Sequence, residues 1–209
     1  MPKILLLFLI GLFFYSCSST KNRKVKTKYF DENYTEISKS EFERIRKTNR
    51  LLDIPGDSAH HKKLTLRERH GKINNRALLE STLEKAINRE LDSEKPLVIM
   101  YYPGKDPCNS SGNKSKNDSR INWRKVFEHA IYEVGQTKPI YIYKDHSGLQ
   151  KGYDSIYHKD PNGIIERLFF KHHYPCSSFV VISKDGDFIS YFGEHSSGYV
   201  ITATKLMNK

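Results

Sequence analysis

The sequence lacks the motifs of several common functional classes. It has no glycine-rich loop of the kind that cradles phosphate groups and no Gly-x-Ser-x-Gly nucleophile elbow of a hydrolase. It also has no zinc-finger or RNP-type motif, so nucleic acid is not expected as a partner despite the net charge of +11. Hydrophobic residues make up only 37% of the 209 positions, which suits one domain with an appended segment rather than two full domains.

Long apolar runs are scarce, and the most continuous one, Ile4 to Tyr15, follows a short positive start at the N-terminus. It is too short to span a bilayer as a stable helix and predicts a secretory signal over residues 1–16. Cys17 comes next, in a pattern that resembles the lipobox of bacterial lipoproteins. The resemblance implies that Cys17 is acylated, for example with palmitate, and anchors the chain in the cell envelope. An ordinary signal with a chance cysteine is the alternative.

Acidic residues are missing from the start of the segment behind the anchor, where the first is Asp31. Basic residues are frequent there, namely Lys21, Arg23, Lys24, Lys26 and Lys28. Residues 17–34 are therefore expected to form a basic tether, which either rests on anionic lipid headgroups or is simply solvated. Ser18 resembles the residue at this place in lipoproteins sorted to the outer membrane, which implies a chain that faces the periplasm.

Residues 35–74 are expected to form a helical extension followed by a loop. Ser38-x-x-Glu41 is a capping-box pattern, which predicts that a helix begins there. Residues 53–75 contain helix- and strand-breaking residues, histidines and charged residues in no regular order. This composition predicts a loop, with at most one strand near residues 63–67.

Residues 75–209 contain a regular series of helices and strands. Apolar residues at helical spacing predict four helices, at 75–91, 122–134, 160–169 and 199–207. The second is expected to bury Trp123, Val126 and Phe127. Runs rich in β-branched and aromatic residues predict strands at 97–102 and 140–143 and a hairpin formed by 179–182 and 188–192.

This order of elements, with Pro175 just before the hairpin, resembles the thioredoxin-like fold, especially extracytoplasmic thiol–disulfide oxidoreductases related to cytochrome maturation proteins. The resemblance implies an α/β fold, a three-layer sandwich with a central mixed sheet over residues 75–209. Its two central strands should be parallel, because a helix crosses between them, and the hairpin should add antiparallel strands at the edge. The family's proline at this place is cis and faces the reactive thiol.

Cysteines are few, and only Cys108 and Cys176 lie in the expected domain. In the family, a Cys-x-x-Cys pair follows the first central strand, whereas this chain has Cys108-x-x-Ser111 there. The fold nonetheless brings the loop with Pro175 against the loop after that strand. The resemblance therefore implies that Cys108 and Cys176 are neighbours and form a disulfide in an oxidising compartment.

Three roles remain open for this pair. It is a structural disulfide, or a redox-active pair in which Cys108 attacks, Cys176 resolves and Pro175 shapes the substrate groove. Alternatively, with His172 or His173, the thiols hold a soft ion such as Cu(I). No cofactor or metal is assigned. The other histidines are expected to be surface or locally hydrogen-bonded residues.

Two functions follow from these roles. The first is thiol–disulfide exchange by a membrane-anchored envelope lipoprotein, with a thiol substrate as its partner. The second is a non-catalytic binding lipoprotein, of the adaptor or immunity type, whose partner is an envelope protein. The sequence does not decide whether the chain is an enzyme.

Overall fold

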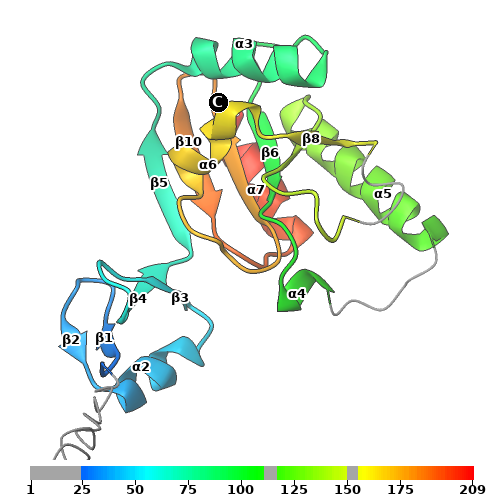
Figure 1. Ribbon diagram of the computed structural model, residues 1–209. Helices are drawn as coiled ribbons and strands as arrows, with labels where there is room; N and C mark the ends of the chain where they lie inside the picture. The colour runs from blue at the N-terminus through cyan, green and yellow to red at the C-terminus, as the bar shows by residue number, and fades with distance from the viewer. Residues whose placement is uncertain (1–24, 111–116, 150–154) are drawn as a thin grey trace, which may run out of the picture.

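The computed structural model describes residues 25–110, 117–149 and 155–209 (Figure 1). The chain folds into a small domain, residues 28–66, and a large domain, residues 68–209, each built on its own sheet with helices beside it. No helix in the described part of the chain combines the length and the apolar content that crossing a membrane requires. The predicted signal, residues 1–16, and Cys17 lie outside the described residues.

The small domain is a four-stranded mixed sheet with one helix. Its elements are β1 (Lys28–Phe30), β2 (Glu36–Ile37), α2 (Lys39–Arg46), β3 (Leu51–Pro55) and β4 (His61–Leu66), with the strand order β2-β1-β4-β3. The capping prediction is confirmed, because the Ser38 hydroxyl accepts a hydrogen bond from the Glu41 amide at the start of α2. The prediction for the segment after this helix is only partly right: the strand expected near residues 63–67 is β4, but the rest is not the expected loop. Most of that segment pairs into strands, and β1 takes up part of the predicted tether.

Strand β3 explains how the small domain packs on the large one. Successive residues of a strand point to opposite faces, so Leu51 and Leu52 face different cores. Leu51 packs with Phe42 and Leu64 in the small domain's own core. Leu52 belongs to a core cluster of the large domain, against which Ile54 also packs. The small sheet therefore lies between α2 and the large domain.

The large domain contains a six-stranded sheet. Its strands are β5 (Glu68–Lys72), β6 (Leu97–Tyr102), β7 (Ile140–Tyr143), β8 (Tyr157–Lys159), β9 (Ser178–Ile182) and β10 (Asp187–Tyr191), in the order β5-β10-β9-β6-β7-β8. The parallel pairing of β6 with β7 is confirmed. Strand β6 is buried along its whole length, as its continuous apolar run predicts. The hairpin β9–β10 is not at the edge, however, because β5 pairs with β10 and β9 pairs with β6.

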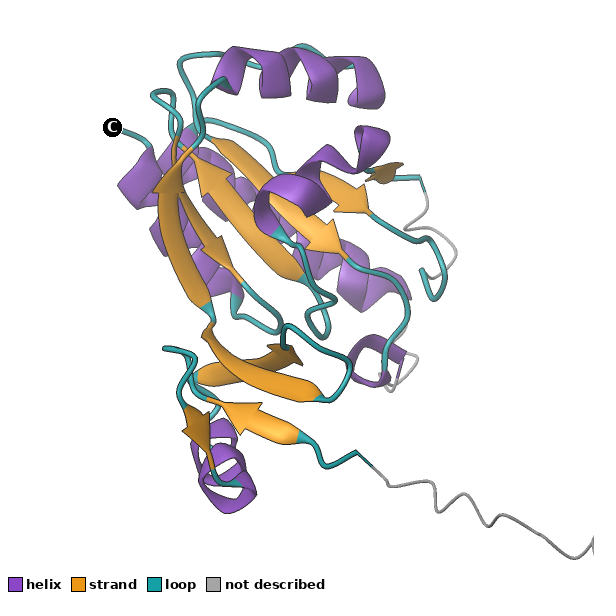
Figure 2. Ribbon diagram, turned by 60° about the vertical axis from the view of Figure 1, so that its left-hand side comes forward, coloured by secondary structure: helices purple, strands orange, loops and turns teal. Residues whose placement is uncertain are grey.

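Helices cover both faces of the large sheet (Figure 2). They are α3 (Arg76–Ile87), α4 (Pro107–Ser110), α5 (Asn117–Gly135), α6 (Ile164–Phe169), which follows the 3-10 turn η2 (Pro161–Gly163), and α7 (Ser197–Met207). Helices α3 and α6 supply Leu83 and Phe169 to one core cluster. Helices α5 and α7 supply Phe127 and Val200 to the cluster on the opposite face. The result is a layered α/β architecture with a mixed sheet in the middle, which confirms the coarse fold class.

The buried face of helix α5 is narrower than predicted. Phe127 and Ile131 are buried as their spacing requires, but Trp123 and Val126 are 52% and 69% exposed. The apolar stripe of this helix is thus wider than the surface that the sheet and α7 cover. The spacing of apolar residues correctly predicted the helix. It overestimated the number of apolar side chains that the helix buries.

Candidate functional site

A disulfide joins Cys108 in α4 to Cys176, two residues before β9. Because β6 and β9 are antiparallel neighbours, the end of β6 and the start of β9 meet at the same end of the sheet. The two Cα atoms are 5.1 Å apart, within the usual range for a disulfide, although 68 positions separate the residues. The expected bond is confirmed. Figure 1 shows α4 at the end of the large sheet that faces the small domain.

A buried carboxylate connects the two loops that carry the cysteines. Asp106 accepts hydrogen bonds from the backbone amides of Asn109, at 2.8 Å, and Cys176, at 2.9 Å. In return, the Asn109 side-chain oxygen accepts from the Asp106 amide at 2.9 Å. The side-chain nitrogen of Asn109 donates to the carbonyl oxygens of Gly104, at 2.7 Å, and Cys176, at 3.2 Å. The loops are therefore held together by polar contacts as well as by the sulfur–sulfur bond.

The backbone at the second cysteine departs from the family pattern. The described residues contain no cis peptide bond, so the bond before Pro175 is trans and the cis proline implied by the resemblance is not found. Cys176 instead has a φ of 68°, in the left-handed region that a non-glycine residue adopts only at a cost of about 1–3 kcal/mol. The Asp106 contact to its amide is one of the interactions that hold it there.

Glu194 is the residue of this site that sequence reasoning missed. One of its carboxylate oxygens and the sulfurs of Cys108 and Cys176 all lie within 4.8 Å of one another. Neither cysteine is fully buried, and Glu194 is exposed. Among the described residues, the Glu194 carboxylate makes no hydrogen bond or ion pair.

The loop that carries Glu194 is fixed by a buried arginine from the junction between the domains. Arg67 donates to the carbonyl oxygens of Phe192 and Glu194, both at 3.3 Å, and to the side chain of Asn49 in the small domain. Gly193, at a φ of 76°, fits tightly between Arg67 and the Pro175 carbonyl. A Cβ atom at Gly193 would come within 3.2 Å of the Pro175 carbonyl and within 3.3 Å of Arg67.

The histidines near the site make local contacts. His173 Nε2 lies 3.2 Å from the Asp106 carboxylate, and the His172 ring packs edge-on against Tyr174. Burial lowers the pKa of His172, and so does the neighbouring charge of Lys171. His195 Nδ1 lies 3.1 Å from the Gly193 carbonyl. Neither His172 nor His173 belongs to the group that surrounds the sulfurs, so the histidine-containing copper set is not assembled in the described residues.

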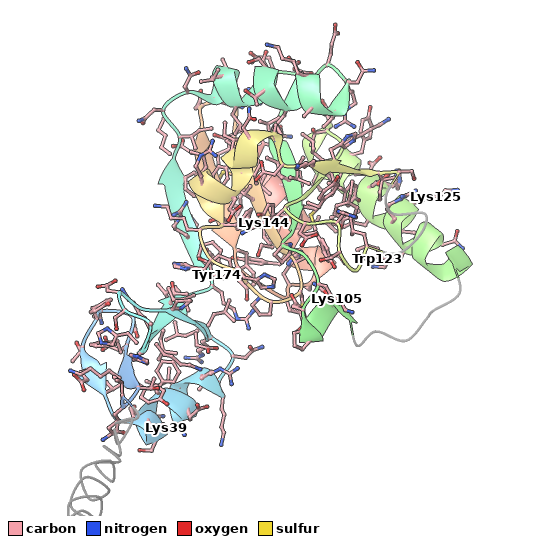
Figure 3. All side chains as sticks on the ribbon, in the orientation of Figure 1. Lys39, Lys105, Trp123, Lys125, Lys144 and Tyr174 are labelled. Atoms are coloured by element: carbon pink, nitrogen blue, oxygen red, sulfur yellow. A yellow bond between two sulfur atoms is a disulfide. The ribbon has the colours of Figure 1, made fainter. Side chains whose placement is uncertain are left out.

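Aromatic side chains line the core beside this end of the sheet, as expected (side chains are drawn in Figure 3). Tyr174 stacks on Phe192 with ring centroids 4.2 Å apart. Burial raises the pKa of Tyr174 to about 12. Tyr101 stacks on Phe170 in the core, and burial raises its pKa as well. These tyrosines stabilise the wall of the site and have no evident chemical role in it.

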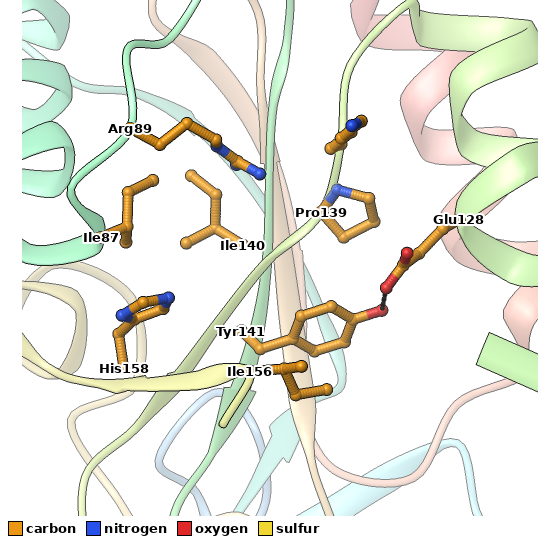
Figure 4. A pocket seen from close by; sticks show the side chains of 9 residues that line it. Ile87, Arg89, Glu128, Pro139, Ile140, Tyr141, Ile156 and His158 are labelled. Carbon is orange, nitrogen blue, oxygen red and sulfur yellow. Dashed lines mark hydrogen bonds between the residues drawn. The ribbon is translucent and has the colours of Figure 1, made fainter. Parts of the chain in front are cut away.

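A hollow lies beside strands β7 and β8 (Figure 4). It has a volume of about 210 Å³ and is formed by Ile87, Arg89, Glu128, Lys138, Pro139, Ile140, Tyr141, Ile156 and His158. The Tyr141 hydroxyl donates to Glu128 at 3.1 Å, and burial raises its pKa. This hollow adjoins the start of β7, whereas the disulfide follows the end of the parallel strand β6. It is therefore separate from the cysteine site.

Comparisons with models of protein families, with curated proteins and with solved structures found nothing that matches this chain.

Proposed function

We propose that this chain is a cell-envelope lipoprotein, anchored through Cys17, whose large domain is thioredoxin-like and exchanges disulfides through Cys108 and Cys176. The observation that carries the proposal is the bond between these two cysteines, across the ends of β6 and β9 and beside Pro175. The anchor is inferred from the N-terminal sequence alone, in which the apolar run ends at a cysteine followed by serines.

The topology of the large domain supports the thioredoxin-like assignment. Strands β7, β6, β9 and β10 are consecutive neighbours, with the first pair parallel and the later pairs antiparallel. Helix α5 crosses from β6 to β7 on one face, where α7 joins it, and α6 lies on the other face. The resemblance implies the same arrangement. Strands β5 and β8 are then additions at the two edges.

The disulfide is the oxidised half of the proposed reaction. In the reducing direction, the Cys108 thiolate attacks one sulfur of a substrate disulfide, and the other substrate sulfur leaves as a thiolate that takes up a proton. The Cys176 thiolate then attacks the Cys108 sulfur, which restores the internal bond and releases the second substrate thiol. Two electrons pass to the substrate, and the reverse sequence oxidises a dithiol.

The second candidate function is a binding lipoprotein with a structural disulfide. The hydrogen bonds of Asp106 and Asn109 favour this function, because they hold both cysteine loops in place. The absence of a second cysteine in α4 also favours it. A link that closes so long a loop stabilises a chain by about 2–4 kcal/mol. In this case the large domain would serve as a platform for an envelope protein partner.

A redox equilibrium of the full chain with glutathione separates the two candidates. If the pair exchanges disulfides, its potential lies above about −300 mV, and Cys108→Ser abolishes disulfide reduction in an insulin assay. A potential below about −300 mV, together with a Cys108→Ser variant that only melts earlier, would leave the structural role. Cys17→Ser serves as the control, because it removes the cysteine outside the proposed site and leaves Cys108 and Cys176 in place.

The anchor is tested independently of the redox chemistry. The chain with Cys17 is expected to incorporate labelled palmitate in bacterial cells and to fractionate with membranes. Cys17→Ala is expected to do neither. Equal labelling of the two chains would refute the anchor and leave the redox proposal intact.

A further inference from the structure

Three possible metal ligands converge at the disulfide. They are the sulfurs of Cys108 and Cys176 and a carboxylate oxygen of Glu194, all within 4.8 Å of one another. Thiolate and carboxylate groups bind Zn²⁺ at about 2.3 Å and about 2.0–2.2 Å respectively. Ligands of one tetrahedral ion at these lengths are roughly 3.5–4 Å apart. Once the sulfur–sulfur bond is broken, small movements of the side chains would bring the three groups to this spacing.

The backbone near each ligand is held by contacts that do not involve the disulfide. The Asp106 carboxylate fixes the amide of Cys176 and caps the short helix of Cys108 through Asn109. Arg67 fixes the carbonyl oxygen of Glu194 at 3.3 Å. The backbone of these loops should therefore stay in place after reduction, which lowers the entropic cost of binding an ion.

The ligand types favour Zn²⁺ over Cu(I). Cu(I) is selected by soft ligands, whereas a carboxylate is a hard oxygen ligand that Zn²⁺ accepts together with thiolates. His173 is not available as a replacement in this structure, because its ring lies against Asp106. Three protein ligands leave a fourth position for water, as in zinc sites that are open to a substrate.

We propose that the reduced chain binds one Zn²⁺ through Cys108, Cys176 and Glu194, and that oxidation of the two thiols releases the ion. An external dithiol supplies two electrons and two protons to the disulfide and becomes a disulfide itself. Zn²⁺ then displaces both thiol protons. In the oxidised chain the two sulfurs are bonded to each other, so the thiolates that the ion needs do not exist. The inference requires a reducible bond at the proposed site but no exchange with a protein substrate.

The test titrates the full chain in detergent with Zn²⁺ in competition with a chromophoric chelator. The chain is first reduced with excess dithiol and desalted without oxygen. One equivalent should bind to the reduced chain and none to the oxidised chain. Glu194→Gln, which keeps both cysteines, should weaken binding by roughly tenfold or more. Glu90→Gln is the matched control, since it removes the same charge from an exposed residue far along the chain.

Co²⁺ provides a second readout, because thiolate coordination produces intense charge-transfer absorption in the near ultraviolet. This band should appear with the reduced chain and vanish on oxidation. Binding to the reduced chain that is no tighter than to Cys108→Ser would overturn the site, and so would equal affinities of Glu194→Gln and the unchanged chain. These results do not depend on the redox potential, so failure here is distinguishable from failure of the exchange proposal.

Discussion

The small and large domains differ in how much core each has of its own. Three residues, Phe42, Leu51 and Leu64, form the small domain's own buried cluster, whereas the large domain contributes fifteen and ten buried residues to its two clusters, the first of which Leu52 also joins. A unit of about 40 residues seldom folds alone without a disulfide or a metal. The small domain therefore depends on its neighbour, to which Leu52 and Arg67 connect it. A small sheet without a crosslink of its own can thus be stable because its second face is buried against a larger unit.

Phe179→Ala should have the largest effect, because it removes a fully buried ring from central strand β9. This ring contacts His195 and Tyr199 at centroid distances of 4.9 and 5.6 Å. We expect a loss of about 4 kcal/mol in the free energy of unfolding. Urea titrations followed by circular dichroism should show that both domains unfold earlier. Val126→Ala, at a largely exposed site, is the control and should change stability by less than about 0.5 kcal/mol.

Leu64→Ala tests whether the large domain depends on the small domain. Leu64 is fully buried in the small core, and its loss should cost about 3 kcal/mol. Amide hydrogen exchange should quicken across residues 28–66, while β6 and β9 keep their protection. Leu66→Ala makes the same truncation on the same strand at a 58% exposed position and should have little effect. Lost protection in β6 as well would mean that the two domains unfold as one unit.

Arg67→Met tests the connection between the domains. The substitution keeps an apolar stem but removes the donors to the oxygens of Phe192, Glu194 and Asn49. The expected cost is about 1–3 kcal/mol. The urea transition should separate into two steps, since the small domain loses its attachment. Arg50→Met changes an exposed arginine and should leave one transition. A single transition in Arg67→Met would assign the connection to the packing of Leu52 instead.

The two domains also differ in how far the sequence predicts them. In the large domain, continuous apolar runs and helical spacing indicate β6 and α3 because burial there is strong and local patterns follow it. In the small domain, strands such as β4 are short and mostly polar: it begins with His61, Lys62 and Lys63 and has apolar residues only at Leu64 and Leu66. Their pairing depends on distant partners, for example Lys28 with His61. A pairing between residues so far apart in the sequence leaves no local pattern, so this sheet was not predicted.

The same distinction holds within the candidate site. The pairing of Cys108 and Cys176 could be predicted because a family resemblance supplied the missing spatial information. Glu194 could not, since a single acidic residue in a loop has no distinctive pattern. Its position depends on Arg67, which is 127 positions away in the sequence. The only local signal was Gly193, a glycine directly after a predicted strand.

The pH dependence of stability is expected to be the smallest effect and to come from the large domain. Burial lowers the pKa of His195 more strongly than its hydrogen bonds to the Gly193 and Ser177 backbone raise it. The folded chain thus takes up this proton less readily than the unfolded chain, whose histidine has a pKa of about 6.5. Stability should be highest above about pH 6.5, decline as the pH falls below it, and level off below the folded pKa.

Urea midpoints between about pH 7.5 and about pH 5.5 measure this decline. His195→Gln should flatten it, because glutamine does not titrate and can still donate to the Gly193 carbonyl. Some decline should remain, since burial also lowers the pKa of His158 and His172. His146→Gln removes a histidine whose side chain is 83% exposed and should leave the decline unchanged. If His195→Gln has the same slope as the unchanged chain, the acid sensitivity resides in the other two histidines, and His195 is accessible to protons in the folded state.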